Sequence, residues 1–166
     1  TARVQASTRS LASRALQLAE FPDEHVGWTV AAAGALRGRR FDVVLASAPP
    51  HSCLLLGATL AHRTGGRLVL DYRDPWLEVL SADGTYGNDR AYPQWERAMH
   101  RWLEDQTLAR AHLVLAVTPR IQRWLTARTK VPVHFLPNGL DVTPPDPPVP
   151  FAQPLRVVYA GSLAYD

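Results

Sequence analysis

The sequence predicts an α/β fold, a parallel sheet flanked by helices. Short segments rich in branched apolar residues alternate with longer segments of helical periodicity, a pattern typical of strand–helix–strand units. The apolar segment 68–70 changes abruptly to Asp-Tyr-Arg-Asp-Pro-Trp over residues 71–76. Charged groups are costly to bury without partners, and ligands of open α/β sheets bind at the carboxyl ends of strands. We therefore expect a binding site at the end of this strand.

Five helices are expected from apolar residues that recur at helical spacing. Asp23 is the expected cap of the second helix, and Ser52 is the expected N-cap of the third, which Gly65-Gly66 ends. Thr118 is the expected cap of the fifth, ahead of a proline at the first helical position. The expected helices span residues 1–19, 24–37, 53–63 and 92–110, with the fifth starting at 119.

Two of these helices carry aromatic residues that we expect to face the core. In the fourth helix, the Trp and Met stripe is expected to be core rather than a cofactor site, opposite a charged face. The residues expected to face inward are Trp28, Ala31, Ala32 and Leu36 in the second helix, and Trp95, Met99, Trp102, Leu103 and Ala109 in the fourth.

Five strands are expected, over residues 41–46, 68–72, 112–117, 131–136 and 155–160. The first two are joined by a single helix with short connections, so we expect parallel pairing with a right-handed crossover. Their carboxyl ends then share one edge of the sheet. This places the loop Pro50-His51-Ser52 beside Arg73 and Asp74.

A proline-rich segment divides the chain. Residues 144–150 contain five prolines, which cannot sit in a helix or a central strand and favour a semi-rigid connector. We expect one domain over residues 1–143, a linker over 144–154, and over 155–166 the first strand and loop of a second domain. The chain is accordingly expected to be a truncated protein or a fragment.

Composition and motifs exclude several classes of protein. Cys53 is the only cysteine, so no internal disulfide can form, and no apolar run reaches the roughly 20 residues of a membrane span. The sequence lacks the glycine-rich dinucleotide motif, the phosphate-loop motif and the hydrolase nucleophile motif, and its six histidines lack metal-ligand spacing.

The net charge is +3, and the basic residues are seventeen arginines and one lysine. Base composition of the genome explains this bias, and a basic face for nucleic acid, membrane lipid or phosphate remains an alternative. The only tight cluster is formed by Arg37, Arg39 and Arg40.

Five motifs then occur in an informative order. They are Ala-Ser-Ala-Pro-Pro-His-Ser (46–52), Asp-Tyr-Arg-Asp-Pro-Trp (71–76), Val-Thr-Pro (117–119), Pro-Asn-Gly-Leu-Asp (137–141) and Tyr-Ala-Gly-Ser-Leu (159–163). With Pro22-Asp23 followed by Trp28, they resemble the family-four retaining glycosyltransferases, which have two facing Rossmann-like domains (GT-B type). The resemblance covers most of residues 20–163.

The resemblance implies transfer of a sugar from a nucleotide-sugar donor to an acceptor hydroxyl, with retention of configuration. The N-terminal domain would hold the acceptor, which is a small molecule, lipid or glycan, and the C-terminal domain would hold the donor. It implies no metal and no other cofactor, no nucleic-acid partner, and a cytoplasmic location, with peripheral contact to the inner face of the membrane as a further option. The sequence departs from the family pattern in two ways. The family's first strand and glycine-rich loop are not found, and its donor-binding residues would lie beyond Asp166.

The resemblance also implies roles for particular residues. His51 would act in catalysis by hydrogen-bonding a donor hydroxyl or stabilising developing charge. The alternatives are a cap or an exposed loop for His51, an internal ion pair for Arg73 and Asp74, a structural role for Asp71, and a packed indole for Trp76. The expected acceptor-binding residues are Arg73, Asp74 and Trp76, and the expected donor-binding residues are Ser52, Asn138, Gly139, Gly161 and Ser162.

A second class of function stays open. A non-catalytic Rossmann-like ligand-binding or regulatory module would share the same strands, helices and loops. The chain alone is expected to be inactive as a transferase, because half of the cleft would lie in the second domain.

Overall fold

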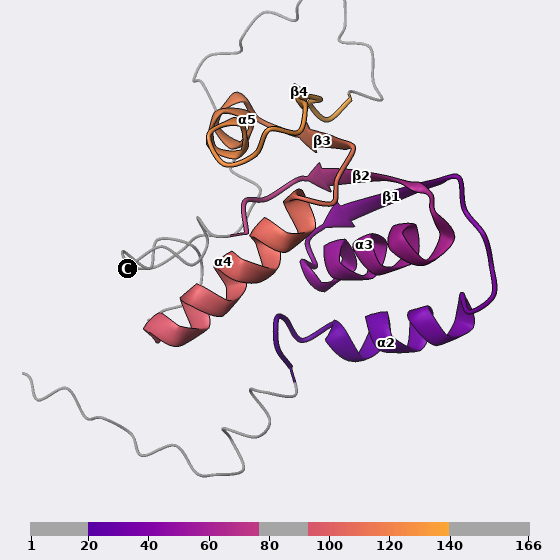
Figure 1. Cartoon of the computed structure of the whole chain (residues 1–166). Coiled ribbons are helices and arrows are strands. Elements are labelled where there is room, and N and C mark those ends of the chain that lie inside the picture. Colours follow the sequence, from indigo (N-terminus) through magenta and orange to yellow (C-terminus); the bar gives the residue numbers. More distant parts are fainter. Residues whose placement is uncertain (1–19, 77–92, 140–166) are drawn as a thin grey trace, which may run out of the picture.

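The computed structural model describes residues 20–76 and 93–139. The helix expected over 1–19, the loop 77–91, the proline-rich linker and the strand expected over 155–160 lie outside the described residues, as does the domain boundary at 143. Figure 1 shows the arrangement of the described part.

The centre of the described part is one sheet of four parallel strands in the order β1-β2-β3-β4. The register aligns the carboxyl ends of neighbouring strands. Four predicted strands are therefore confirmed, although β1 continues two residues beyond its predicted end. The strands span Val43–Ala48 (β1), Arg67–Tyr72 (β2), Leu113–Ala116 (β3) and Val133–Phe135 (β4).

In the described ranges, one helix lies between each strand and the next. Figure 1 shows α3 beside β1 and β2, with α2 as a further layer on the far side of α3 from the sheet. Buried residues of α3, α4 and α5 belong to one core cluster with the strands, so these three helices lie on the same face of the sheet. The helices span Val26–Ala35 (α2), Ser52–Thr64 (α3), Gln94–Leu108 (α4) and Pro119–Thr126 (α5).

One face of the sheet forms the core. Ala46, Leu70 and Val114 lie in one row across three strands and are buried, together with residues from α3, α4 and α5. On the opposite face, Val43 is 57% exposed and Leu45 is 64% exposed. The described helices therefore cover the first face and leave this part of the second open.

Helix α3 approaches β1 closely because it carries a glycine at the crossing. A Cβ atom at Gly57 would lie 2.5 Å from the Cβ of Ala46. The helix ends as predicted at Gly65, whose φ of 71° is left-handed, a conformation that glycine adopts without strain. These two glycines fix where α3 lies on the sheet and where it stops.

The predicted inward faces of α2 and α4 are wrong in their aromatic residues, whereas Leu103 packs against the core as predicted and Ala32 and Leu36 are half-buried. Trp28 of α2 is 61% exposed and Ala31 is also exposed, whereas Thr29 is the buried residue of this helix, which packs on α3. In α4 the exposed stripe is Trp95 (55%), Met99 (44%) and Trp102 (57%). The face of α4 that packs inward carries polar groups with internal partners, among them His100, Glu104 and Thr107.

Glu104 shows how such a polar face is tolerated. Its carboxylate pairs with the guanidinium of Arg128, which also pairs with Asp105 and lies over the ring of Trp124. Burial raises the pKa of Glu104 to about 7, although the hydrogen bond and charge of Arg128 oppose that rise. The cation that pairs with this buried carboxyl comes from the turn after α5.

Two of the three predicted caps are wrong. Thr118 caps α5 as predicted, since its hydroxyl accepts from the Ile121 N–H at 3.2 Å. The N-cap of α2 is His25, whose backbone N–H donates to the Asp23 carboxylate at 3.0 Å. Ser52 is the first residue of α3, preceded by His51 at the N-cap position. The side chain that serves the start of α3 is Asp23, as described below.

No helix in the described ranges is both long enough and apolar enough to cross a membrane.

Candidate functional site

The residues that follow β1, β2 and β4 gather at the carboxyl edge of the sheet. The Arg73 N–H donates to the Ala48 carbonyl at 3.0 Å, which joins the segments after β1 and β2. The Leu136 N–H donates to the Ala116 carbonyl at 2.9 Å, which extends the same edge to β4. The predicted placement of His51 beside the Arg73–Asp74 pair is therefore confirmed. We call this edge the carboxyl rim.

His51 occupies the first turn beyond β1. Its imidazole stacks on the indole of Trp76, with ring centroids 5.0 Å apart and an interplanar angle of 18°. The Nε2 atom of His51 is buried and has no hydrogen-bond partner in the described part of the chain. An unpaired buried nitrogen is uncommon in proteins and marks a position that a ligand group could satisfy.

Trp76 is packed rather than open to a ligand. Its side chain is 2% exposed, and its indole N–H donates to Nδ1 of His100 at 3.0 Å. His100 also meets the ring of Phe21, with centroids 4.5 Å apart. Of the two alternatives for Trp76, the structure shows the packed indole. Any part it takes in acceptor binding would act through His51. Phe21, His51, Trp76 and His100 together form what we call the rim cluster.

The rim cluster holds both histidines in the neutral form at neutral pH. Burial lowers the pKa of His51 to about 4, against the opposing effects of the Asp23 carboxylate and the Asp74 carbonyl. Burial also lowers the pKa of His100 to about 4, and nearby His51 adds to this. Because Nδ1 of His100 accepts from Trp76, the neutral ring carries its proton on Nε2.

Asp23 fixes the residue that follows His51. Its carboxylate accepts from the Ser52 N–H at 2.7 Å and from the Ser52 hydroxyl at 2.8 Å. Ser52 is 1% exposed, so its hydroxyl is used inside the protein. A negative carboxylate is also favourable at the N-terminus of α3, where free backbone N–H groups point outward. The donor-binding role of Ser52 stays a prediction.

The exposed part of the carboxyl rim is polar. The Arg73 guanidinium donates to Oδ1 of Asn138 at 2.8 Å, which links the ends of β2 and β4. Asp74 and Gly139 are exposed beside them. Among the described residues no ion pair joins Arg73 to Asp74, so that alternative is wrong. The two remaining donor-binding candidates, Gly161 and Ser162, lie outside the described residues.

Asp71 has the structural role that was expected. Its carboxylate accepts from the Ser47 hydroxyl at 2.8 Å, which joins β1 to β2 just before the rim. No backbone at Asn138 or Gly139 adopts a positive φ, since the positive φ angles of the described residues occur at Gly38 and Gly65. The segment after β4 is therefore not the left-handed turn that an Asn-Gly pair can form.

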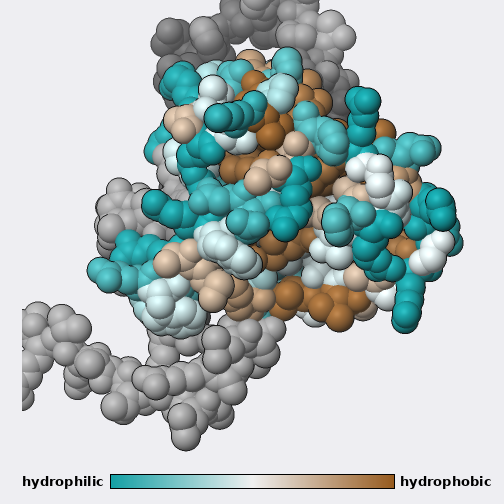
Figure 2. All heavy atoms as spheres, viewed as in Figure 1, coloured by the Kyte–Doolittle hydropathy of each residue, from teal (hydrophilic) through white to brown (hydrophobic). Residues whose placement is uncertain are grey.

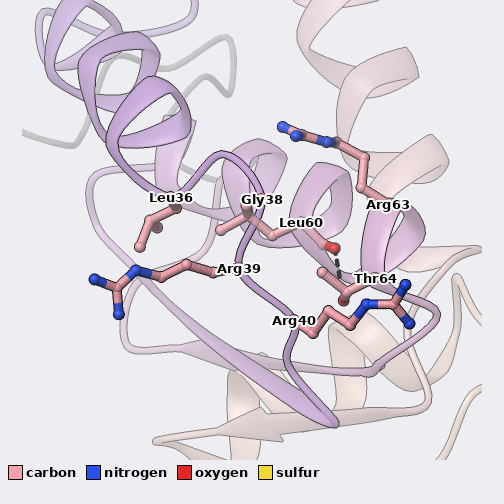
Figure 3. A pocket seen from close by; sticks show the side chains of 7 residues that line it. All are labelled: Leu36, Gly38, Arg39, Arg40, Leu60, Arg63 and Thr64. Atoms are coloured by element: carbon pink, nitrogen blue, oxygen red, sulfur yellow. Dashed lines mark hydrogen bonds between the residues drawn. The ribbon is translucent and has the colours of Figure 1, made fainter.

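Two hollows of the described part lie at the other edge of the sheet, around the ends of α2 and α3. One has a volume of about 280 Å³ and is lined by three arginines (Figure 3). The other, of about 270 Å³, lies between Gly65, Gly66 and His112. Residues 20–76 and 93–139 contain no group of three side chains suited to hold a metal ion.

Sequence reasoning missed three residues of the site. His100 contacts Trp76, and Phe21 contacts His100. The periodicity of their segments did not predict either contact. Asp23 was recognised as a capping residue from its position after a proline, but it serves α3 rather than α2. Only the chain path in space brings these residues to the rim.

A parallel sheet flanked by helices, with a polar carboxyl rim, is a Rossmann-like fold. The model of Glycosyltransferase Family 4 matches residues 5–143, and the chain belongs to this family. No protein in the curated collection matches the chain significantly. Membership of the family supports a role of the glycosyltransferase type.

Proposed function

We propose that this chain forms the acceptor-side domain of a cytoplasmic retaining glycosyltransferase of the GT-B type. The donor would be a nucleotide sugar and the acceptor the hydroxyl of a small molecule, lipid or glycan. The observation that carries the proposal is the meeting of His51, Arg73 and Asn138 on one rim of a domain of this family. A second domain would close over this rim and hold the donor.

His51 is proposed to act as a neutral hydrogen-bonding group. Its lowered pKa keeps the ring uncharged at neutral pH, and its Nε2 atom lacks a partner in the described part of the chain. A donor hydroxyl that pairs with this nitrogen would gain a hydrogen bond in a water-poor setting, where such bonds are strong. An interaction that strengthens as the sugar acquires positive charge would speed the reaction.

The bond changes need no nucleophilic side chain. The bond between the anomeric carbon and the diphosphate oxygen breaks, and the pair of electrons leaves with the diphosphate. The acceptor oxygen forms a new bond to the same face of the anomeric carbon. Its proton passes to the departing diphosphate, so atoms and charge balance. This front-face course accounts for retention without a metal, as in the family that the sequence resembles.

Arg73 and Asp74 are proposed to hold the acceptor. Both are exposed at the rim, where a guanidinium suits a phosphate or carboxylate and a carboxylate suits sugar hydroxyls. Asn138 orients the guanidinium through its side-chain oxygen. The donor-side residues would then be Ser52, Asn138, Gly139, Gly161 and Ser162.

The test is a titration of the complete gene product with a panel of nucleotide sugars. A nucleotide sugar at a hundred times its Kd is expected to stabilise the protein by about 2.7 kcal/mol and to raise Tm. The stabilising donor is then supplied with acceptors, and NMR of the product gives its anomeric configuration. Retention is the expected result, and an inverted product would contradict the proposal.

The same experiment separates the alternative function. A regulatory module would show the rise in Tm with a nucleotide sugar but no transfer to any acceptor and no release of nucleotide. If no nucleotide sugar raised Tm and no transfer occurred, a nucleotide sugar would be excluded as a ligand of this protein.

A further inference from the structure

Two buried rings lie in sequence behind His51. The indole of Trp76 covers one face of the imidazole, with ring centroids 5.0 Å apart and an angle of 18° between the planes. The indole N–H in turn donates to Nδ1 of His100 at 3.0 Å, and these two rings meet edge to face. Both Trp76 and His100 are buried. The ring that His51 touches is therefore itself held by a hydrogen bond inside the protein.

The bond to His100 selects one orientation of the indole. The torsion that turns an aromatic ring on its Cβ atom is broad, so packing alone fixes the plane only weakly. A buried N–H that loses its acceptor is costly, because it has given up water without a replacement. Rotation of Trp76 away from His100 would incur that cost. The plane of the indole is thus set by an acceptor on α4.

His51 needs such support because its other contacts leave the plane of its ring open. It is the N-cap residue of α3 and forms no capping bond with its side chain. The Asp74 carbonyl lies within hydrogen-bonding range of the ring, and Nε2 has no partner among the described residues. One hydrogen bond holds one atom of a ring, whereas stacking holds the whole plane. The face of Trp76 therefore decides where Nε2 points.

The inner side of α4 carries a polar residue where an apolar one would pack at less cost. Figure 2 shows mainly hydrophilic to neutral side chains, in teal to white, on the outer surface over α4. His100 lies on the inner side of this helix, 3% exposed, and Phe21 packs on its ring with centroids 4.5 Å apart. A buried polar group is tolerated when it is hydrogen-bonded. The histidine at this position is explained by the N–H of Trp76 that it accepts.

We propose that His100 and Trp76 are positioning residues for His51 in sugar transfer. His100 holds the indole, the indole holds the plane of the imidazole, and Nε2 is thereby aimed at the reacting sugar. Both residues are buried, so they act through His51 and not by contact with the substrate. The inference rests on the proposed function, in which His51 pairs with a donor hydroxyl. It assigns a part in the reaction to α4.

A purely structural role is the competing explanation. The two rings would then fill the space beside α4, and their loss would lower stability without moving His51. Measurements on His51 itself separate the two explanations, because only positioning predicts that a change at His100 alters the environment and the action of another residue.

The test compares two substitutions at His100. An asparagine places its amide oxygen close to the position of Nδ1, so His100→Asn keeps an acceptor for the indole N–H. His100→Leu has no acceptor and leaves that N–H buried without a partner. The matched control is Thr107→Val on the same helix, which removes a buried hydroxyl that donates to the Leu103 carbonyl at 2.7 Å. Thr107 lies outside the rim cluster, and urea unfolding reports the stability of every variant.

The first measurement does not require activity. NMR of the histidine rings of the full chain gives the pKa of His51, which burial lowers to about 4 against the opposing charge of Asp23. Release of the indole would admit water, so in His100→Leu this pKa should rise toward its ordinary value of 6.5. It should rise much less in His100→Asn, which removes the charge of protonated His100 equally, and should not change in Thr107→Val.

The second measurement is steady-state kinetics of the complete gene product. His100→Leu should lower kcat about ten-fold, because a displaced group loses its alignment with the transition state, and should leave KM for both substrates nearly unchanged. His100→Asn should recover most of that loss. When His51 is already replaced by alanine, His100→Leu should cause no further loss of kcat, because its effect passes through His51.

Three results would overturn the inference. They are a pKa of His51 that is the same in His100→Leu as in the unaltered chain, an equal rise of that pKa in Thr107→Val, and losses of kcat that add in the double variant. Absence of transfer by the unaltered gene product would instead remove the proposed function. The NMR titration would then still decide whether His100 and Trp76 hold the ring of His51 in place.

Discussion

The carboxylate of Asp23 accepts both the backbone N–H and the hydroxyl of Ser52, a residue 29 positions further along the chain. Its two oxygens thereby serve the start of α3, whose N-cap residue His51 has no capping side-chain bond of its own. The same carboxylate accepts from the His25 N–H at the start of α2. One acid thus ties the starts of two helices together, immediately beside the rim cluster.

Asp23→Ala is expected to destabilise the protein by about 1–3 kcal/mol, because it leaves a buried N–H and hydroxyl of Ser52 without an acceptor. The measurement is the free energy of unfolding in urea. The matched control is Glu24→Ala, since the Glu24 side chain is 79% exposed and lies 3.6 Å from the exposed His25. That change should alter stability by at most about 0.5 kcal/mol. Equal losses in the two variants would contradict this account.

Gly57→Ala is expected to destabilise by about 1–3 kcal/mol, although alanine favours helices. Its Cβ atom would lie 2.5 Å from that of Ala46, so α3 must move away from β1. Gly27→Ala is the control, because a Cβ there would have no neighbour within 4 Å. This second change should stabilise by up to about 1 kcal/mol through helix propensity. Urea unfolding of both variants gives the comparison, and two changes of the same sign would refute it.

Acidification is expected to destabilise the domain through the two histidines of the rim cluster. Their pKa values are about 4 in the folded protein and about 6.5 in the unfolded chain. The stabilisation is therefore complete above pH 6.5 and is lost as the pH falls toward 4, on the order of 3 kcal/mol for one such group. The measurement is the free energy of unfolding as a function of pH. Below pH 6.5 it should fall less steeply in the His51→Gln variant than in the unaltered protein. His62→Gln, at an exposed position, is the matched control.

Glu104 is expected to act in the opposite direction. Its pKa is about 7 in the folded protein against 4.5 as the ordinary value, so its protonated form is favoured by folding. That contribution is complete below pH 4.5 and is lost as the pH rises through 7. As the pH rises from 5 to 8, the free energy of unfolding should therefore fall less in the Glu104→Gln variant than in the unaltered protein. An identical slope in the two proteins would show that Arg128 keeps the carboxylate charged throughout.

His51→Ala in the complete gene product is expected to lower kcat for sugar transfer about a hundred-fold, as removal of one positioned hydrogen-bonding group does in other enzymes. Arg73→Ala is expected instead to raise KM for the acceptor, with the donor-induced rise in Tm unchanged. Steady-state kinetics with each substrate varied separates the two effects. Arg101→Ala, at an exposed residue of α4, is the control. If Arg73→Ala weakened the binding of the donor alone, Arg73 would belong to the donor site and the acceptor-binding prediction would be contradicted.

The strands and the carboxyl rim could be predicted because they follow from short-range pattern and chain connectivity. Branched apolar runs mark β1 to β3, and parallel crossovers bring His51 and Arg73 to one edge whatever the side chains pack against. The inward faces of α2 and α4 could not be predicted. Their burial depends on partners far away in sequence, as His100 does on Trp76 and Glu104 on Arg128, each 24 residues away.

The open face of the sheet affects how the protein behaves in concentrated solution. Val43 and Leu45 point outward from β1, and in the part that the structure describes β1 pairs with β2 alone. An apolar edge strand of this kind is a template for adding strands from other molecules. Handling the isolated chain at high concentration thus favours precipitation through β1, and a lysine in place of Leu45 would be the natural remedy.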